Sequence, residues 1–310
     1  DDHLMGTTDV IRGDEWISSA PIHLQLFDVL GFETPRYAHN SPIMKEDAET
    51  GGKRKLSKRK DPEAAVTYSH EVGYPKEAVL EYLLTIANSN YEEWRTANPD
   101  VSSDEFDFKL SNMSKAGALF DLLKLNDISK NYICRLTKEE VFANVSEWAQ
   151  KYDAEFAKLL NENKDYAVRI FGIERGNEKP RKDIAKWQDA VYYTKYFFFA
   201  PTEYEWQDNL SNADMIEILD AYKSVYSPSE TGDEWFPKVR EMAENLGYAK
   251  APKVYKKNPD DFKGHVGDVA SVIRVAVTGR RNTPDLYEIL QTLGYDEFSA
   301  RVDKAIETLK

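Results

Sequence analysis

Cysteine is almost absent from this sequence, since Cys134 is the only one in 310 residues. A single cysteine excludes an internal disulfide framework and a cysteine-rich zinc site, and it fits a reducing cytoplasmic compartment. The five histidines show no metal-ligand spacing such as His-x-x-x-His. We therefore expect no protein-bound metal in this chain.

Long apolar runs are missing as well. Charged residues interrupt every apolar patch, so the sequence predicts no membrane span. Residues 1–5 carry neither the basic region nor the apolar core of a signal peptide. The chain does not begin with Met, and its first residues lead at once into a β-like run. From this we expect a fragment of a longer protein.

Charge, by contrast, is abundant and mostly negative, with 54 acidic residues against 41 Lys and Arg and a net charge of -13. A pI near 5.0 argues against indiscriminate binding to DNA or RNA. It permits a specific RNA contact if the cations gather on one face. Apolar residues make up 41% of the chain and charged residues 31%, which is typical of a globular protein of two or three domains.

Against this acidic background one segment is strongly basic. Residues 53–60, Lys-Arg-Lys-Leu-Ser-Lys-Arg-Lys, hold six cations and no anion and follow Gly51 and Gly52. The glycines predict a mobile loop as the approach to this segment, and Asp61 with Pro62 predicts the N-cap and first position of a helix. A cationic loop leading into a helix start suits a polyphosphate. A solvated basic loop or a targeting patch is the alternative.

The periodicity predicts a small α/β part and then a long helical part. A strand at 7–12 is followed by a helix that starts at residues 18–21 and ends at Gly31, with Ile22, Leu26, Val29 and Leu30 as its apolar face. This strand, loop and helix make half of a βαβ unit, in which the loop at the carboxyl end of the strand would carry the ligand. A second extended segment is expected at 36–44. The later helices are expected at 75–88, 113–125, 137–160, 183–199, 212–226, 234–246, 264–278 and 283–293, with a last one reaching the C-terminus.

The segment Lys55-Leu56-Ser57-Lys58-Arg59 resembles the signature loop of class I aminoacyl-tRNA synthetases in its glutamyl variant. Residues 1–6, 10–16 and 21–23 are similar to the second half of a bacterial-type glutamyl-tRNA synthetase active site. The similarity resumes at 274–279 and 283–286, and residues 138–263 match only in pattern. It covers nearly all of the chain.

The resemblance implies a mainly α fold with a small α/β part. The second half of a Rossmann-type catalytic domain would occupy 1–70, and a helical stem-contact domain 71–137. Two anticodon-binding helical subdomains would then occupy 138–205 and 206–310. The first βαβ half of the catalytic domain, with its His-Ile-Gly-His-like motif, does not occur in the sequence.

For catalysis, the resemblance implies that Lys55 and Lys58 neutralise charge on the triphosphate of ATP and on the departing pyrophosphate. Met44 and Ser57 would join these lysines in binding ATP, and Mg²⁺ would arrive with the nucleotide. The alternative is that both lysines are solvated and that Met44 fills a gap in the core.

Arg12 and Trp16 would contact L-glutamate or its adenylate, Arg12 through a bidentate grip on a carboxylate. The alternatives are that Arg12 pairs with Asp14 or Glu15 to hold the loop, and that Trp16 only packs.

At the other end of the chain, the resemblance implies that tRNA anticodon bases are read by Arg274, Thr283, Pro284 and Leu286. The alternative for Thr283-Pro284 is an N-cap with Pro at the first helical position. A cluster of aromatics at helical spacing could form a base-stacking platform, but we expect it to belong to the core. Its members are Tyr192, Tyr193, Tyr196, Phe197, Phe198 and Phe199.

The function implied is the ATP-dependent attachment of glutamate to tRNA(Glu) through a glutamyl-adenylate, by a cytoplasmic monomer. Because the first half of the catalytic domain is missing, we expect this chain alone to bind tRNA without forming the adenylate. The alternatives are a non-catalytic helical tRNA-binding module and a helical interaction scaffold with no RNA role.

Overall fold

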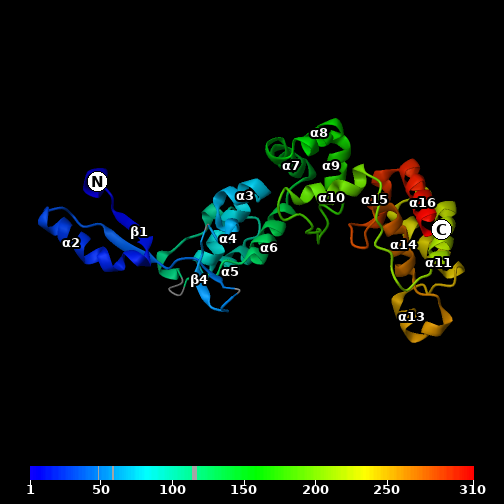
Figure 1. The fold of residues 1–310 in the computed structure, drawn as a ribbon, viewed down its shortest axis with the longest axis horizontal. Coiled ribbons are helices and arrows are strands. Elements are labelled where there is room, and N and C mark those ends of the chain that lie inside the picture. The colour runs from blue at the N-terminus through cyan, green and yellow to red at the C-terminus, as the bar shows by residue number, and fades with distance from the viewer. Residues whose placement is uncertain (48, 58, 114–116) are drawn as a thin grey trace. The chain divides into compact units, whose positions relative to one another are not determined.

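The structure is a computed structural model that describes residues 1–47, 49–57, 59–113 and 117–310. It divides into two compact units, Asp1–Ile133 and Cys134–Lys310, called here unit 1 and unit 2. Unit 1 joins a small α/β part to helices, and unit 2 is helical, which confirms the expected fold class (Figure 1). The finer boundaries at 70/71 and 205/206 stay a prediction.

Unit 1 begins with two parallel strands, and a helix follows the first of them. Its elements up to residue 55 are α1 (Asp2–Met5), β1 (Asp9–Gly13), the 3-10 helix η1 (Asp14–Ser19), α2 (Ala20–Val29), β2 (Arg36–Asn40), β3 (Met44–Glu46) and β4 (Lys53–Lys55). In the parallel pair Asp9 lies opposite Arg36 and Gly13 opposite Asn40. The predicted strand, helix and second extended segment are thereby confirmed.

This α/β part has no core of its own. Among the described residues from 1 to 60, only Pro35 is buried. The side chains expected to form the inward face of α2, Ile22, Leu26, Val29 and Leu30, are instead exposed. That expectation was wrong because the described residues provide no second layer against α2 and the two strands (Figure 1).

The approach to the basic segment is more regular than expected. β3 and β4 pair antiparallel, with Met44 opposite Lys55 and Glu46 opposite Lys53. The strand β3 departs from the predicted loop, whereas Gly51 and Gly52 lie in a bend outside both strands. The predicted helix start at Asp61 is the short 3-10 helix η2 (Pro62–Ala64), and the Asp61 side chain makes no capping hydrogen bond to it.

The rest of unit 1 is helical. Its elements are α3 (Val66–Val72), α4 (Lys76–Ala87), α5 (Tyr91–Ala97), the 3-10 helices η3 (Ser103–Glu105) and η4 (Leu110–Asn112), and α6 (Leu122–Ile133). A small core between α4 and α6 contains Tyr74, Tyr82 and Leu125. Leu83 on α4 lies outside this core and is exposed.

The helix expected at 113–125 was wrong, and residues 114–116 of that range lie outside the described residues. Leu119 is extended and bridges to Met44. Asp121 Oδ1 then accepts hydrogen bonds from the backbone N–H groups of Leu123 and Lys124 at 2.8 and 3.2 Å. Because Asp side chains satisfy the free donors of a first helical turn, α6 begins only after Asp121.

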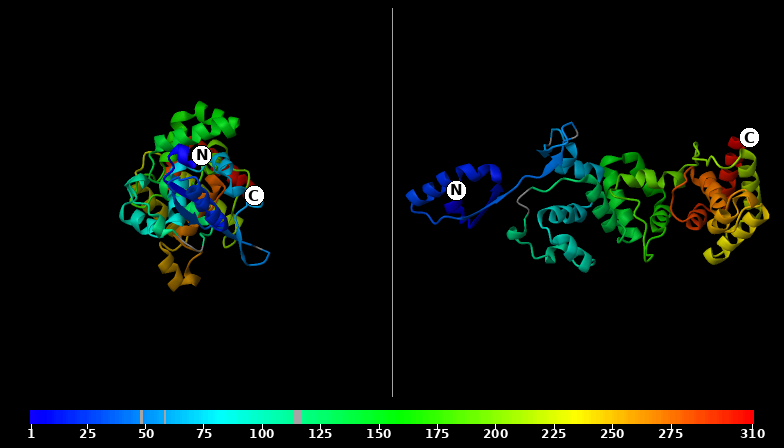
Figure 2. Two further views of the ribbon diagram at one scale, coloured as in Figure 1. Left: turned by 90° about the vertical axis from the view of Figure 1, so that its left-hand side faces the viewer. Right: turned by 90° about the horizontal axis from the view of Figure 1, so that it is seen from below.

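Unit 2 is a set of helices packed side by side (Figure 2, green through red). They are α7 (Lys138–Tyr152), α8 (Ala154–Glu162), α9 (Lys164–Gly172), α10 (Asp189–Phe198), α11 (Asn212–Val225), α12 (Gly232–Asn245), α13 (Pro252–Lys257), the 3-10 helix η5 (Pro259–Asp261), α14 (Val266–Thr278), α15 (Leu286–Leu293) and α16 (Tyr295–Leu309). The main core lies among α11, α12, α14 and α16, and a second one joins α9, α10 and α15.

Several helices of unit 2 begin or break at different residues than the periodicity predicts. The range 137–160 is two helices, because Asp153 ends α7 and caps α8 through the Phe156 N–H at 3.0 Å. The helix expected from residue 183 begins at Asp189, and the one expected from Thr283 begins at Leu286 with Asp285 as its N-cap. No described helix combines the length and apolarity needed to cross a membrane.

Candidate functional site

Arg12 lies near the end of β1, as the sequence predicts, and two imidazoles hold its guanidinium. Nε donates to His39 Nε2 at 3.0 Å, and Nη1 lies 2.7 Å from His23 Nδ1. The guanidinium carbon also lies 4.7 Å from the Tyr37 ring centroid and 5.9 Å from that of Trp16. The orientation of the Arg12 guanidinium is therefore fixed by His39 on the neighbouring strand, by His23 on α2 and by two aromatic rings.

The contacts of Arg12 leave its charge without a carboxylate partner in the part of the chain that is described. Because a guanidinium can only donate, both facing imidazole nitrogens must be unprotonated acceptors. The alternative pairing of Arg12 with Asp14 or Glu15 is not formed, and Glu15 instead pairs with Lys55 at 3.3 Å. An arginine held by neutral groups keeps its capacity to bind an anionic ligand.

Within the basic segment 53–60, Arg54 and the backbone of Ser57 bind a carboxylate of the same chain, that of Asp61. Arg54 donates to both carboxylate oxygens of Asp61, at 2.6 and 2.7 Å, and the Ser57 N–H donates to Asp61 Oδ2 at 3.0 Å. Lys45 lies 3.2 Å from Asp61 and also pairs with Glu63. Hydrogen bonds from Arg54, above all, lower the pKa of Asp61 well below its usual range.

The remaining predicted ATP residues are placed unevenly. Lys55 is exposed on β4, and its ammonium group reaches Glu15. The backbone of Met44 is already engaged, since its N–H donates to the Ala118 carbonyl and its carbonyl accepts from Phe120 N–H. Lys58 lies outside the described residues. The structure therefore places the Lys55 side chain beside Glu15, three residues after Arg12 in the sequence. The roles in ATP binding stay predictions.

The predicted anticodon residues form one cluster at the C-terminal half of α14. Arg274 Nη1 donates to the Thr283 carbonyl at 3.2 Å and also contacts Thr283 Oγ1 and the Pro284 carbonyl. Burial lowers the pKa of the Arg274 guanidinium from its ordinary value. Leu286 does not face outward, because it is 2% exposed and belongs to the main core. The alternative reading of Thr283 as an N-cap was wrong, since Asp285 caps α15.

Periodicity alone missed further polar residues beside this cluster. Arg181 pairs with Asp183 at 2.7 Å and donates to Asn282 Oδ1 at 3.3 Å. Arg281 donates its backbone N–H to Glu205 at 2.9 Å. The only sequence signal for them was the charge of the loop after Gly279, because the elements they join are far apart along the chain.

The aromatic cluster of α10 divides into two groups. Tyr196 and Phe197 are buried, as expected of core residues. Tyr192 and Phe199 are 64% and 57% exposed, so the expectation of core positions was wrong for these two. Tyr192 lies on α10, Phe199 follows the end of that helix, and neither belongs to the second core.

No group of three or more His, Cys, Asp or Glu residues in the described ranges is arranged to hold a metal ion. The expectation of no protein-bound metal stays a prediction.

Two family models match the chain in separate stretches. The model described as tRNA synthetases class I (E and Q), catalytic domain, matches residues 1–127, and the model described as anticodon binding domain matches residues 177–306. Arg12 and Lys55 lie in the first stretch, and the Arg274 cluster lies in the second.

Comparisons that cover nearly the whole of this chain agree with the two family models. The chain is 46% identical to the glutamate–tRNA ligase of Acetivibrio thermocellus over 309 residues, which cover 99% of this chain and 56% of that protein. It is 48% identical to the glutamate–tRNA ligase of Clostridium beijerinckii over 311 residues, covering 98% and 56%. A solved glutamate tRNA ligase from Elizabethkingia meningosepticum, in complex with its amino acid, superposes with a TM-score of 0.69 at 26% identity, covering 100% of this chain and 59% of that one.

Proposed function

Because the chain belongs to the class I tRNA synthetases of the glutamate and glutamine group, and spans 56% of the length of its glutamate–tRNA ligase relatives, we propose a function in glutamylation of tRNA. The parent enzyme would activate L-glutamate with ATP and pass the acyl group to tRNA(Glu) in the cytoplasm, as a monomer. Mg²⁺ would enter with ATP. The observation that carries this proposal is the alignment of nearly the whole chain with enzymes named for that reaction.

In this proposal Arg12 binds a carboxylate of glutamate or of the adenylate. Support comes from the two imidazoles and two rings that orient its guanidinium without neutralising it. Trp16 would cover the same ligand, since its exposed indole lies beside Arg12. A preorganised guanidinium of this kind binds an anion without the reorganisation that a mobile side chain requires.

The basic segment would act on the phosphates. Lys55 and Lys58 would stabilise the charge on ATP and pyrophosphate, with Ser57 and Met44 contributing to the nucleotide site. Arg54 is assigned a different task, because Asp61 engages both of its terminal nitrogens. It would hold the turn through Ser57 in place while the lysines face the ligand.

Alone, this chain would bind tRNA without activating glutamate. Adenylate formation works by positioning and charge stabilisation from both sides of the triphosphate. This chain has no His-Ile-Gly-His-like motif, and the parallel sheet formed by its described residues has two strands. Unit 2 would supply the tRNA contact through Arg274, Thr283 and Pro284. The buried side chain of Leu286 would support that surface from behind.

Two assays on the purified chain test this proposal. Binding of a tRNA(Glu) transcript should be measurable, should weaken with added salt and should exceed binding of an unrelated RNA of equal length. ATP–pyrophosphate exchange with glutamate should be absent. Exchange activity would overturn the claim that the chain alone is inactive. Failure to bind either RNA would favour the helical scaffold without an RNA role, and equal affinity for both would contradict specific recognition of tRNA(Glu).

A substitution separates the catalytic reading from the tRNA-binding module. In a protein restored to the length of the relatives, Lys58→Ala should lower the aminoacylation rate by about 10²- to 10³-fold while tRNA affinity is retained. Lys60→Ala, two positions later in the same segment, removes the same charge and serves as the control. Weakened tRNA binding with normal adenylate formation would instead support the non-catalytic module.

A further inference from the structure

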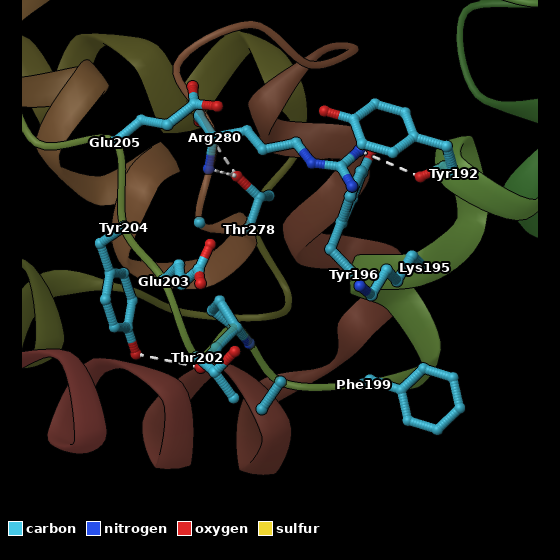
Figure 3. A pocket seen from close by; sticks show the side chains of 13 residues that line it. Tyr192, Lys195, Tyr196, Phe199, Thr202, Glu203, Tyr204, Glu205, Thr278 and Arg280 are labelled. Atoms are coloured by element: carbon cyan, nitrogen blue, oxygen red, sulfur yellow. Dashed lines mark hydrogen bonds between the residues drawn. The ribbon is translucent and has the colours of Figure 1, made fainter.

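A pocket of about 370 Å³ lies in unit 2, apart from the Arg274 cluster. The end of α10, the segment 200–205 and the end of α14 line it (Figure 3). Arg274, Thr283 and Pro284 do not contribute to its lining. The side chains that matter for its chemistry are Tyr192, Tyr196, Phe199, Glu203, Glu205 and Arg280.

One wall of the pocket is a stacked cation and ring. The guanidinium carbon of Arg280 lies 3.5 Å from the ring centroid of Tyr192, and Nη1 donates to the Tyr192 carbonyl at 3.0 Å (Figure 3). The Tyr192 side chain is largely exposed, and so is that of Phe199, which also lines the pocket. Guanidinium planes and exposed aromatic rings are the surfaces on which proteins stack unpaired bases.

Behind this wall lies a hydrogen-bonding group without a partner. Tyr196 is 4% exposed, and its hydroxyl has no hydrogen-bond partner among the described residues. In Figure 3 the Tyr196 side chain points from α10 towards Arg280, whose guanidinium carbon lies 5.3 Å from the Tyr196 ring centroid. An unpaired buried hydroxyl is destabilising, and a ligand oxygen reached by a shift of the long Arg280 side chain would satisfy it.

Another part of the lining is held by the end of α14. Gly279 has a left-handed φ of 77°, and a Cβ at that position would meet the Glu203 carbonyl oxygen at 2.7 Å. The Glu205 N–H donates to the Gly279 carbonyl at 3.0 Å, which ties the segment 200–205 to the helix end. The backbone on this side of the pocket is therefore held in place before any ligand arrives.

The charges on the lining cancel. Lys195 and Arg280 oppose Glu203 and Glu205, and one oxygen of Glu205 already accepts from Arg281 N–H. A balanced lining does not favour a phosphate or a carboxylate. It favours a flat, neutral ring that offers amino donors to a carboxylate and a carbonyl acceptor to a hydroxyl or ammonium group.

From these features we propose that the pocket takes one unpaired guanine or cytosine base of a bound tRNA, stacked against Arg280 and Tyr192. Both bases carry an amino donor and a carbonyl acceptor, which Glu203 and Tyr196 would complement. The inference rests on the proposed tRNA-binding function of this chain, and it adds a second base contact outside the Arg274 cluster.

The test compares two surface pairs of the same chemistry. Arg240 lies over the ring of Phe236 on α12, with its guanidinium carbon 5.2 Å from the centroid, and neither residue lines the pocket. The variants Arg280→Ala and Tyr192→Ala should each weaken binding of a tRNA(Glu) transcript by about tenfold. Arg240→Ala and Phe236→Ala remove an equal charge and an exposed ring, and they should change the affinity less than twofold.

A finer test uses nucleotides and the buried hydroxyl. CMP, GMP, UMP and AMP are titrated separately into the isotope-labelled chain, and binding is followed by NMR spectroscopy. CMP and GMP should shift the resonances of the pocket residues more strongly than UMP or AMP. Tyr196→Phe removes one oxygen and keeps the ring, so it should weaken CMP and GMP binding several-fold without lowering the melting temperature.

The outcomes separate this inference from the function on which it rests. If the parent chain does not bind tRNA(Glu), the proposed function fails. If it binds and the pocket variants behave like the α12 controls, only the base pocket is overturned. Nucleotide shifts in the pocket together with unchanged tRNA affinity would also overturn it, because the pocket would then serve a free nucleotide.

Discussion

At Asp61 four hydrogen-bond donors converge on one buried carboxylate. They come from the two terminal nitrogens of Arg54, the backbone of Ser57 and the ammonium group of Lys45. The residue is 1% exposed, which for an acid is tolerated only with such compensation. Sequence reasoning placed Asp61 at a helix start and so missed that its side chain points back to the basic segment.

We predict that Asp61→Asn destabilises unit 1, because the neutral amide leaves Arg54 and Lys45 without their shared counter-charge. The lowered pKa of Asp61 gives the sign of the pH dependence. Its stabilisation is complete above the unfolded value of about 3.8 and is lost as the pH falls through the lower folded value. The melting temperature of the parent should exceed that of Asp61→Asn by a constant amount between pH 7 and about pH 4. This difference should shrink as the pH is lowered further towards 2.

The matched control is Asp107→Asn, which breaks the exposed pair between Asp107 and Lys109. Exposed pairs contribute little, so its unfolding curve should follow the parent closely. A melting temperature for Asp61→Asn equal to that of the control would contradict the role given to Asp61.

At the scale of helices, Arg301 joins three elements of unit 2. It is 1% exposed on α16, its Nη1 donates to the carbonyls of Tyr196 on α10 and Val277 on α14, and Nε donates to Glu297 at 2.7 Å. Both carbonyls lie near the ends of their helices, where intrahelical donors run out. One buried guanidinium therefore supplies the donors that two helix ends lack.

We predict that Arg301→Met lowers the free energy of unfolding of unit 2 by about 2–4 kcal/mol. Methionine fills a similar space, but the two carbonyls lose their donor while they remain buried. Denaturant unfolding followed by near-ultraviolet circular dichroism measures the change. Lys304→Met, at an exposed position of the same helix, should have little effect, and an equal or increased stability of Arg301→Met would refute the prediction.

The local signals predicted well where a side chain caps its own helix. The capping box of Thr137 and Glu140 starts α7 at the residue where the range 137–160 predicts a helix to begin, and α11 spans Asn212–Val225 against an expected 212–226. The errors lie where distant partners decide. Leu119 is extended because it bridges to Met44. Residues 44–46 and 53–55 are strands because they pair with each other.

The same distinction holds for the candidate sites. Arg12, Lys55 and the members of the Arg274 cluster could be named because local motifs resemble those of a known family. The histidines that orient Arg12 come from α2 and β2. The pocket beside Arg280 needs α10 and α14 together. Neither arrangement has a signature in a single stretch of sequence, because packing brings its members together.

At the scale of the molecule, the two units differ in how their folds are supported. Unit 2 has a continuous core across α11, α12, α14 and α16, whereas the α/β part of unit 1 leaves the apolar side chains of α2 exposed. Hydrogen bonds that are not covered by packing open locally at low free-energy cost. The chain as a whole should therefore not unfold in one transition.

We predict that backbone amides of β1 and α2 exchange with deuterium far faster than those of α14, whose residues lie in the main core. Hydrogen-exchange mass spectrometry of the purified chain measures this peptide by peptide. Adding the segment of the Acetivibrio thermocellus ligase that lies outside the aligned region should slow exchange in α2 and leave α14 unchanged, because further parallel strands and helices would cover the exposed face. Equal protection of α2 and α14 in the chain alone would mean that something already covers that face. Sedimentation at several concentrations would then show whether it is another copy of the chain.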